Sequence, residues 1–338
     1  MAQDGHARWK DYKTRANQTQ LHLSLSSSLS IIQTGTFMPP SYISSEHVSR
    51  FDWLDLLAAL EAGYAKPKGA ADGSFISQSG KALLTRSAWI DEIGAFVKTI
   101  TYCPSNLDQG LHPVQGTASL FHADTGQLVA HFDPDFLTQW KTAGDSVLAA
   151  RRLARADSKN ILIIGAGQIA RGLVMAYRAA YPGAKIHIWN RTAERAQKVA
   201  SELSVRHTHS LKEAIEGADI VSSATGSKTP LIHGAALKPG QHIDLVGSFF
   251  PDAREVDDEA LQNAKLFVNC KDAALGGIGE IALPLESGAI KEADLLSDHY
   301  APEDMRRTSP QEITMFKNCG STHANLIAAA YMAKAVHS

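Results

Sequence analysis

Several features that narrow the function of a protein are scarce in this sequence of 338 residues. Its three cysteines (Cys103, Cys270 and Cys319) form neither a CxxC metal pair nor an even disulfide set, so we expect them to be reduced. The absence of an apolar run of about 18 residues, and of a short apolar block at the N-terminus, argues against a membrane-spanning helix and a secretory signal. The 33 Lys and Arg balance 35 Asp and Glu, so no basic surface for nucleic acid or a membrane is expected. These absences predict a cytoplasmic protein that binds small molecules.

The first half of the sequence predicts a tail followed by a mixed domain. Residues 1–37 are rich in Gln, Ser and Thr without helical or strand periodicity, so they are interpreted as a tail, with Met38 as an alternative start. Residues 51–64 carry apolar residues at helical spacing. Short apolar runs between residues 81 and 132 predict the strands of one sheet, and a long helix is expected at about 137–154.

The second half of the sequence alternates short β-branched runs with helical patterns, beginning at the strand 160–164. This alternation is typical of a parallel sheet with helices on both faces, and it predicts an α/β fold. An Ala-rich helix after Gly320 is expected to pack back on the first half of the chain. We therefore predict an α/β domain at residues 156–307, and a smaller α+β domain that both chain ends form, from residues 38–155 and 308–338.

A glycine motif follows the strand 160–164 directly. Residues 165–170 read Gly-Ala-Gly-Gln-Ile-Ala, which is GxGxxA. Gly165 permits the tight turn, Gly167 lets the backbone approach a pyrophosphate, and Ala170 lets the helix pack closely on the strand. Because a helical pattern and a second strand ending at Trp189 follow, the motif predicts a Rossmann dinucleotide-binding domain. The alternative is a glycine turn without a ligand.

The end of the second strand indicates which dinucleotide would bind. It reads Trp189-Asn190-Arg191-Thr192, without the acidic residue that NAD-binding proteins use to hold the ribose. Arg191 offers charge-assisted hydrogen bonds to a 2′-phosphate, so NADPH is predicted and NADH is expected to bind more weakly. The alternative is that Arg191 is a solvated charge. The predicted cofactor-binding residues follow the first, second and two later strands, and they are Gly165, Gly167, Gln168, Ile169, Asn190, Arg191, Thr192, Ala224, Thr225, Gly247, Ser248 and Phe249.

Two cations stand on neighbouring apolar strands of the first domain. Arg86 lies in LLTRSAWI and Lys98 in GAFVKTITY, where a long cation is unexpected unless it points into a cleft or into water. Two cations that converge on one pocket would suit a carboxylate. For Arg86, an exposed strand edge is an equally good interpretation.

Ordered blocks along most of the chain carry a family resemblance. They are Lys98 followed by Pro104-Ser105-Asn106 and Gly110-Leu111, then LFHADTGQLVAHFD, LTQWKTAGDSVLAARRLA, GAGQIA, WNRT and DLVGSFFPDAREVD. From about Tyr42 to its end, the sequence resembles the ornithine cyclodeaminase and μ-crystallin family. The resemblance implies a homodimer in which a Rossmann domain is inserted into a substrate and dimerisation domain. It also implies that Lys98 and Lys141 help to hold the carboxylate of the substrate.

Departures from the family pattern argue against ornithine cyclisation. The aspartate of the GGDCPGKTE-like segment of ornithine cyclodeaminases is matched by Phe249, which carries no proton. The usual arginine of LTxxRTAA is Lys141, and the usual Gly-Leu-Pro-Thr-Val reads Gly-Leu-His-Pro-Val at residues 110–114. A family arginine upstream of the strand lysine has no clear counterpart, so Arg86 is nominated by position and charge.

The segment VGSFFPDAREVDD, with WKTA and WNRT, more closely resembles the imine reductase branch of the family. That branch includes μ-crystallin ketimine reductases and bacterial Δ1-pyrroline-2-carboxylate reductases. The resemblance implies reduction of Δ1-pyrroline-2-carboxylate to L-proline and of Δ1-piperideine-2-carboxylate to L-pipecolate. A protonated cyclic imine needs a hydride donor, a carboxylate anchor and a dry apolar wall, but no water-activating base. We predict that Lys98, Lys141 and Arg86 form the anchor and that Phe249 forms part of the wall.

Other functions remain open at this point. The enzyme alternatives are an ornithine cyclodeaminase and an NADP-linked amino-acid dehydrogenase. A different class is a non-catalytic protein that binds NADPH and a small ligand, although the presence of Lys98 argues against it. His112 is a candidate proton donor, with a structural role as the alternative. No pair among the 14 histidines has metal-ligand spacing, so no metal is predicted.

Overall fold

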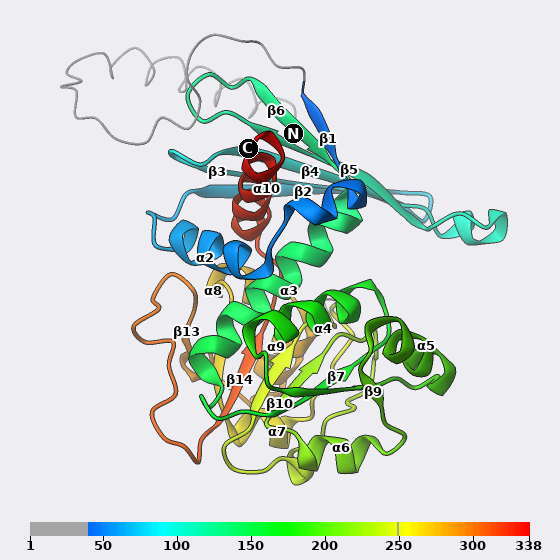
Figure 1. The fold of residues 1–338 in the computed structure, drawn as a ribbon, viewed down its shortest axis with the longest axis vertical. Coiled ribbons are helices and arrows are strands. Elements are labelled where there is room, and N and C mark those ends of the chain that lie inside the picture. Colours follow the sequence, from blue (N-terminus) through cyan, green and yellow to red (C-terminus); the bar gives the residue numbers. More distant parts are fainter. Residues whose placement is uncertain (1–39, 249) are drawn as a thin grey trace. The chain divides into compact units, whose positions relative to one another are not determined.

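The computed structural model describes residues 40–248 and 250–338, which form two β-sheets and the helices that pack on them (Figure 1). The predicted tail, residues 1–37, and Phe249 lie outside the described residues. The strand order is β1-β6-β5-β4-β3-β2 in the six-stranded sheet and β13-β12-β14-β11-β10-β7-β8-β9 in the eight-stranded sheet. Within these ranges, no helix has the length and apolar character needed to cross a membrane. The predicted α/β class is confirmed.

The six-stranded sheet is largely antiparallel. Its strands are β1 (Ser41–Ile43), β2 (Ala70–Gln78), β3 (Lys81–Ile90), β4 (Gly94–Tyr102), β5 (Val114–Phe121) and β6 (Leu128–Phe132), with η2 (Pro104–Gln109) between β4 and β5. Only β1 pairs in parallel, with β6. The register of β3 and β4 places Arg86 directly opposite Lys98, so the two nominated cations share one face of the sheet.

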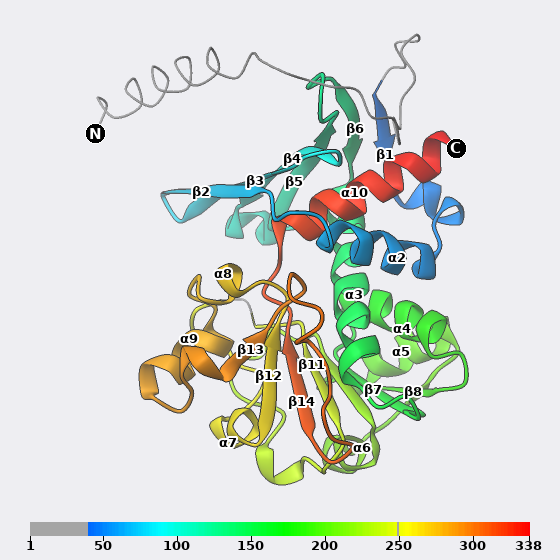
Figure 2. The same ribbon diagram turned by 90° about the vertical axis from the view of Figure 1, so that its left-hand side faces the viewer.

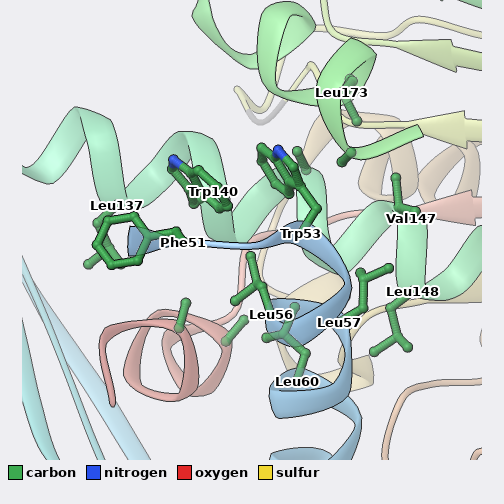
Figure 3. Close-up of a cluster of buried hydrophobic side chains, with 14 of the residues drawn as sticks. Phe51, Trp53, Leu56, Leu57, Leu60, Leu137, Trp140, Val147, Leu148 and Leu173 are labelled. Carbon is green, nitrogen blue, oxygen red and sulfur yellow. The ribbon is translucent and has the colours of Figure 1, made fainter. Parts of the chain in front are cut away.

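Three helices pack on one another beside this sheet, and Figure 2 shows one of them, α10, lying along a face of it. They are α2 (Trp53–Tyr64), α3 (Pro134–Leu153) and α10 (Thr322–His337), with η1 (Ser45–Arg50) before α2. Asp52 caps α2 and Asp133 caps α3, each accepting two backbone N–H groups through its side chain. The indole of Trp53 stacks on that of Trp140, with ring centroids 3.9 Å apart, in a buried cluster with Leu56 (Figure 3). This packing fixes the position of α3, which carries Lys141.

Within the described residues, all strand pairs of the eight-stranded sheet are parallel. Its strands are β7 (Asn160–Ile164), β8 (Lys185–Trp189), β9 (Arg206–His207), β10 (Ile220–Ser223), β11 (His242–Leu245), β12 (Ala264–Val268), β13 (Leu295–Ser297) and β14 (Ile313–Lys317). The helices between them are α4 (Gln168–Ala180), α5 (Ala193–Leu203), α6 (Leu211–Gly217), η3 (Gly234–Ala236), α7 (Asp258–Gln262), α8 (Lys271–Ala274), α9 (Gly279–Ser287) and η4 (Glu292–Asp294). The strand order reverses between β7 and β10, which is where sheets of this kind bind ligands.

The last strand corrects one predicted boundary. β14 pairs with β11 and β12, and only after it does the chain enter α10, which packs on α2 and α3. The boundary predicted between residues 307 and 308 is therefore too early, because the eight-stranded sheet ends at Lys317 in the sequence. Which strands become neighbours depends on long-range packing, so the local pattern of residues 313–317 did not assign this strand to a sheet.

Candidate active site

The glycine motif forms the turn between β7 and α4. Gly165 has a φ of +121°, and a Cβ on it would lie 2.6 Å from the carbonyl oxygen of Ala224. Gly167 is the N-cap of α4, and a Cβ on it would meet no atom within 4 Å. No side chain of the described residues caps this helix. The first backbone N–H groups of α4 are therefore free to donate hydrogen bonds to an anion. The turn has the predicted form, and its contact with a pyrophosphate stays a prediction.

The segment after β8 holds the residues nominated for the 2′-phosphate. Arg191 and Thr192 are exposed, and α5 begins at Ala193. The side-chain amide of Asn190 donates to the carbonyl oxygen of Thr192 over 2.9 Å, which closes the turn. The Asn190 amide is therefore partly used within the protein, and Arg191 is the donor best placed to reach a ligand in solvent.

A buried glutamate that sequence reasoning did not nominate binds the end of β10. Glu255 Oε1 accepts hydrogen bonds from the backbone N–H of Thr225 and the hydroxyl of Ser223, at 2.9 and 2.5 Å. Gly247 fits against the same segment so closely that a Cβ on it would lie 2.0 Å from Thr225 O. Ser248 adopts a left-handed φ of +52° and donates through Oγ to Ser227 O. These contacts define the shape of the predicted nicotinamide side of the cleft.

Burial dominates the electrostatics around this glutamate. It raises the pKa of Glu255 to about 7, with Lys317 opposing the shift and Glu280 adding to it. Lys317, at the end of β14, donates to the carbonyl oxygen of Gly247. Glu280 accepts from the backbone N–H groups of Glu255 and Val256. No local spacing links these residues, so the sequence carried no signal for their contact.

Lys98 projects from β4 toward the start of α3. Its ammonium donates to the hydroxyl of Thr138, and it lies 3.4 Å from the carbonyl oxygen of Pro134. Burial, and then the nearby charges of Lys141 and Arg86, lower the pKa of Lys98 to about 8. The charged form is therefore costly in this position.

Lys141 lies on α3, and its charge is near that of Lys98. Only 4% of its surface is exposed, and burial lowers the pKa of its ammonium, with Asp145 opposing that shift and Arg86 adding to it. Arg86 itself is exposed. Among residues 40–248 and 250–338, no carboxylate oxygen lies within 4.0 Å of a side-chain nitrogen of these three cations. A buried lysine and a half-buried lysine beside an arginine, with no carboxylate in ion-pair contact among these residues, are suited to binding an anionic group.

One turn after Lys141, Asp145 forms the centre of a buried polar cluster. It is 0% exposed and accepts hydrogen bonds from the hydroxyl of Tyr64 at 2.7 Å and the amide of Asn269 at 3.0 Å. His299 Nε2 lies 3.3 Å from the carboxylate. Burial alone would raise the pKa of Asp145, but His299, Lys141 and Tyr64 outweigh it and hold the pKa below its ordinary value. Sequence reasoning missed Asp145, although its spacing of four residues from Lys141 on one helix was an available signal.

The remaining nominated groups have other surroundings. His112 is exposed, and its Nδ1 lies 2.8 Å from the carbonyl oxygen of Val114, so its observed contact is local. In the part of the chain that the structure describes, no group of three or more His, Cys, Asp or Glu is arranged to hold a metal, and the absence of a metal stays a prediction.

Comparison with known proteins identifies the family. The model of the ornithine cyclodeaminase/mu-crystallin family matches residues 85–338. The chain belongs to this family. A Δ1-pyrroline-2-carboxylate reductase of Paracoccus denitrificans is 40% identical over 305 residues, which are 87% of this chain and 96% of that protein. The ketimine reductase mu-crystallin of mouse is 33% identical over 69% of this chain and 73% of its own length.

A solved structure of the family is similar in fold. It is the Δ1-pyrroline-2-carboxylate reductase of Thermococcus litoralis in complex with NADH and L-proline, with a TM-score of 0.78 and 26% sequence identity. The similarity covers 88% of this chain and 98% of that one. The predicted family, with its reductase branch, is confirmed.

Proposed function

We propose that this protein reduces cyclic ketimine carboxylates with NADPH: Δ1-pyrroline-2-carboxylate to L-proline, and Δ1-piperideine-2-carboxylate to L-pipecolate. The observation that carries the proposal is the pair formed by the buried Lys141 and the half-buried Lys98, neither of which has a carboxylate in ion-pair contact among the described residues. The relatives named as reductases support the same class, and the chain is an oxidoreductase. A domain division close to the predicted one, a homodimer and a cytoplasmic location belong to the same proposal.

The glycine turn fits a dinucleotide, because Gly167 leaves room for a pyrophosphate and the first turn of α4 has no side-chain cap. Bound NADPH would supply a hydride from its nicotinamide ring. The residues proposed to hold it are Gly165, Gly167, Gln168 and Ile169 at the pyrophosphate, Asn190, Arg191 and Thr192 at the 2′-phosphate, and Ala224, Thr225, Gly247, Ser248 and Phe249 toward the nicotinamide.

Arg191 supports NADPH over NADH. Its guanidinium is exposed at the end of β8, where the sequence has no carboxylate to repel a 2′-phosphate. The relative from Thermococcus litoralis was solved with NADH. The proposed preference for NADPH therefore rests on Arg191 of this chain and has to be measured on this protein.

The three cations hold the substrate by its carboxylate. Lys98 and Lys141 reach the carboxylate from β4 and α3, and Arg86 lies beside them on β3. A positive iminium nitrogen is repelled by these groups, so the ring is oriented with its nitrogen away from them. C2 then accepts the hydride, and the electron pair of the C=N bond becomes the lone pair of the amine. The proton that the iminium already carries completes the product, so this step requires no further acid.

An assay of reduced nicotinamide absorbance tests the proposal. Purified protein is mixed with NADPH and, in turn, Δ1-pyrroline-2-carboxylate, Δ1-piperideine-2-carboxylate, L-ornithine, or pyruvate with an amine. Oxidation of NADPH is expected with the two cyclic ketimines, with L-proline and L-pipecolate as products. Ammonia release from L-ornithine would instead support a cyclodeaminase, reaction of pyruvate with an amine would support a dehydrogenase, and binding without turnover would indicate a non-catalytic protein.

A further inference from the structure

We infer that Asp145 is a positioning residue, whose negative charge on the same face of α3 keeps Lys141 charged for binding the carboxylate of the substrate. This inference rests on the proposed function, because it assigns Lys141 to the carboxylate anchor. Asp145 would thus support the carboxylate anchor without touching the substrate, because it acts through Lys141.

The geometry places Asp145 on the same face of α3 as Lys141. The two residues are four apart on α3, so they lie on one face of that helix. Asp145 opposes the fall in the pKa of Lys141, whereas the carboxylates that oppose the fall in the pKa of Lys98 are Asp133 and Asp135. The main carboxylate neighbours of the two lysines therefore differ.

The charged groups around Lys141 come from three other elements. Arg86 on β3 and Lys98 on β4 are positive and disfavour its charge, and Cys319 follows β14. Burial raises the pKa of the Cys319 thiol to about 12, so this group is neutral near pH 7. Asp145 is therefore the charged carboxylate that offsets the burial of Lys141.

The surroundings of Asp145 hold its negative charge in place. Tyr64 on α2 and Asn269 after β12 donate to it, and His299 after β13 lies beside it. Tyr300 also faces it, and the pKa of Tyr300 is raised by burial and by nearby negative groups, Asp145 among them. Two hydrogen-bond donors and a neighbouring imidazole on one fully buried carboxylate stabilise its ionised form, which a residue needed only for packing would not require.

The test is a cycle of variants that measures binding of pyrrole-2-carboxylate, a planar and unreactive carboxylate, to the NADPH complex. Asp145→Asn should weaken this binding at about pH 8 by tenfold or more, because an opposite charge at close range is worth about one to three pKa units. In a Lys141→Arg background the same substitution should leave the affinity unchanged or raise it. Arginine stays charged without help, and removing a nearby negative charge favours an anion.

Two outcomes of the cycle would overturn the inference. One is an equal loss of affinity in the Lys141 and Lys141→Arg backgrounds, which would make Asp145 a purely structural residue. The other is a folded Asp145→Asn protein with the affinity of the wild type.

A second pair of variants keeps the charge of Asp145 and so tests the inference even if Asp145→Asn does not fold. Tyr64→Phe and Asn269→Ser each remove one neutral hydrogen bond to the carboxylate. Both should retain the affinity at about pH 8 within about threefold, because the carboxylate stays ionised far below that pH. A tenfold loss in either folded variant would assign the effect to cluster geometry and overturn the inference. Failure of the proposed function is distinguishable, because it appears in the wild-type protein as no oxidation of NADPH by the ketimines.

Discussion

Replacing Lys98 with methionine should stabilise the ligand-free protein while it removes most of the activity. Lys98 is charged at pH 7, although burial and the charge of Lys141 lower its pKa to about 8 from 10.5. A pKa depressed by that amount corresponds to a cost on the order of 3 kcal/mol for holding the charge in the folded protein. Methionine has a similar length and carries no charge, so it fills the position without that cost.

The net stabilisation should be smaller than this cost. Lys98→Met also removes the hydrogen bonds to Thr138 and to Pro134 O, each worth about 1 kcal/mol. The Thr138 hydroxyl still donates to Pro134 O over 2.5 Å, so neither group is left without a partner. We therefore expect a gain of about 1 kcal/mol at pH 7, which raises the melting temperature by a few degrees.

The pH dependence gives this prediction a sign that can be checked. Below the folded pKa of about 8, Lys98 is charged in both the folded and the unfolded chain, and its cost is fully present. Between about 8 and 10.5 the folded protein releases the proton first, so the wild type regains stability and the advantage of methionine fades. Melting temperatures of both proteins at about pH 7 and pH 10 measure this.

The control is Lys81→Met, which changes an exposed lysine on β3 of the same sheet and should alter stability by less than about 0.5 kcal/mol. In the activity assay, Lys98→Met should lower kcat/KM for Δ1-pyrroline-2-carboxylate by about two to four orders of magnitude, with NADPH affinity nearly unchanged. A destabilised Lys98→Met protein would mean that the contacts of Lys98 with Thr138 and Pro134 outweigh the cost of burying its charge, which would refute the reasoning. Near-normal turnover would remove Lys98 from the mechanism.

Three further predictions concern the same cleft. The affinity for pyrrole-2-carboxylate should fall about tenfold between about pH 7 and pH 9 as Lys98 loses its proton, and a Lys98→Arg protein that binds should not show this fall. Gly247→Ala should weaken NADPH binding by tenfold or more in a fluorescence titration, because its Cβ would lie 2.0 Å from Thr225 O, while Gly226→Ala, which meets open space, should have little effect. Arg191→Ala should raise the KM for NADPH about tenfold with little effect on NADH, and equal effects on both would contradict the 2′-phosphate assignment.

The parts of the structure that the sequence predicted well are set by local requirements. The turn at Gly165 needs a positive φ and a close approach to Ala224, and only glycine satisfies both, so the motif was visible in the sequence. The helix predicted at 137–154 is observed as Pro134–Leu153, with the Asp133 cap and the first-turn proline as its start signals. In each case neighbouring residues determine the conformation.

The parts that sequence reasoning missed depend on residues far apart in the chain. Glu255 and Lys317 meet at the cleft because β14 is inserted between β11 and β12, which no local pattern specifies. Asp145 lies in contact with Asn269 and His299, which are more than a hundred residues away in the sequence. Family resemblance nominated Lys98 and Lys141. It did not identify the residues around them, because a motif records which residues occur but not what surrounds them in the fold.

With a lysine at position 141, the positive charge of this position depends on the neighbouring groups. The charge of the usual arginine of the family would not. Arginine stays charged at any physiological pH, whereas a buried lysine keeps its charge only with a suitable neighbour. Lys141 has Asp145 as that neighbour, and two positive groups, Arg86 and Lys98, act against it. The arrival of a substrate carboxylate would add a second negative charge and raise the pKa of both lysines. Substrate binding and proton uptake are therefore coupled in this cleft, and the affinity for any anionic ring compound should weaken as the pH rises above about 8.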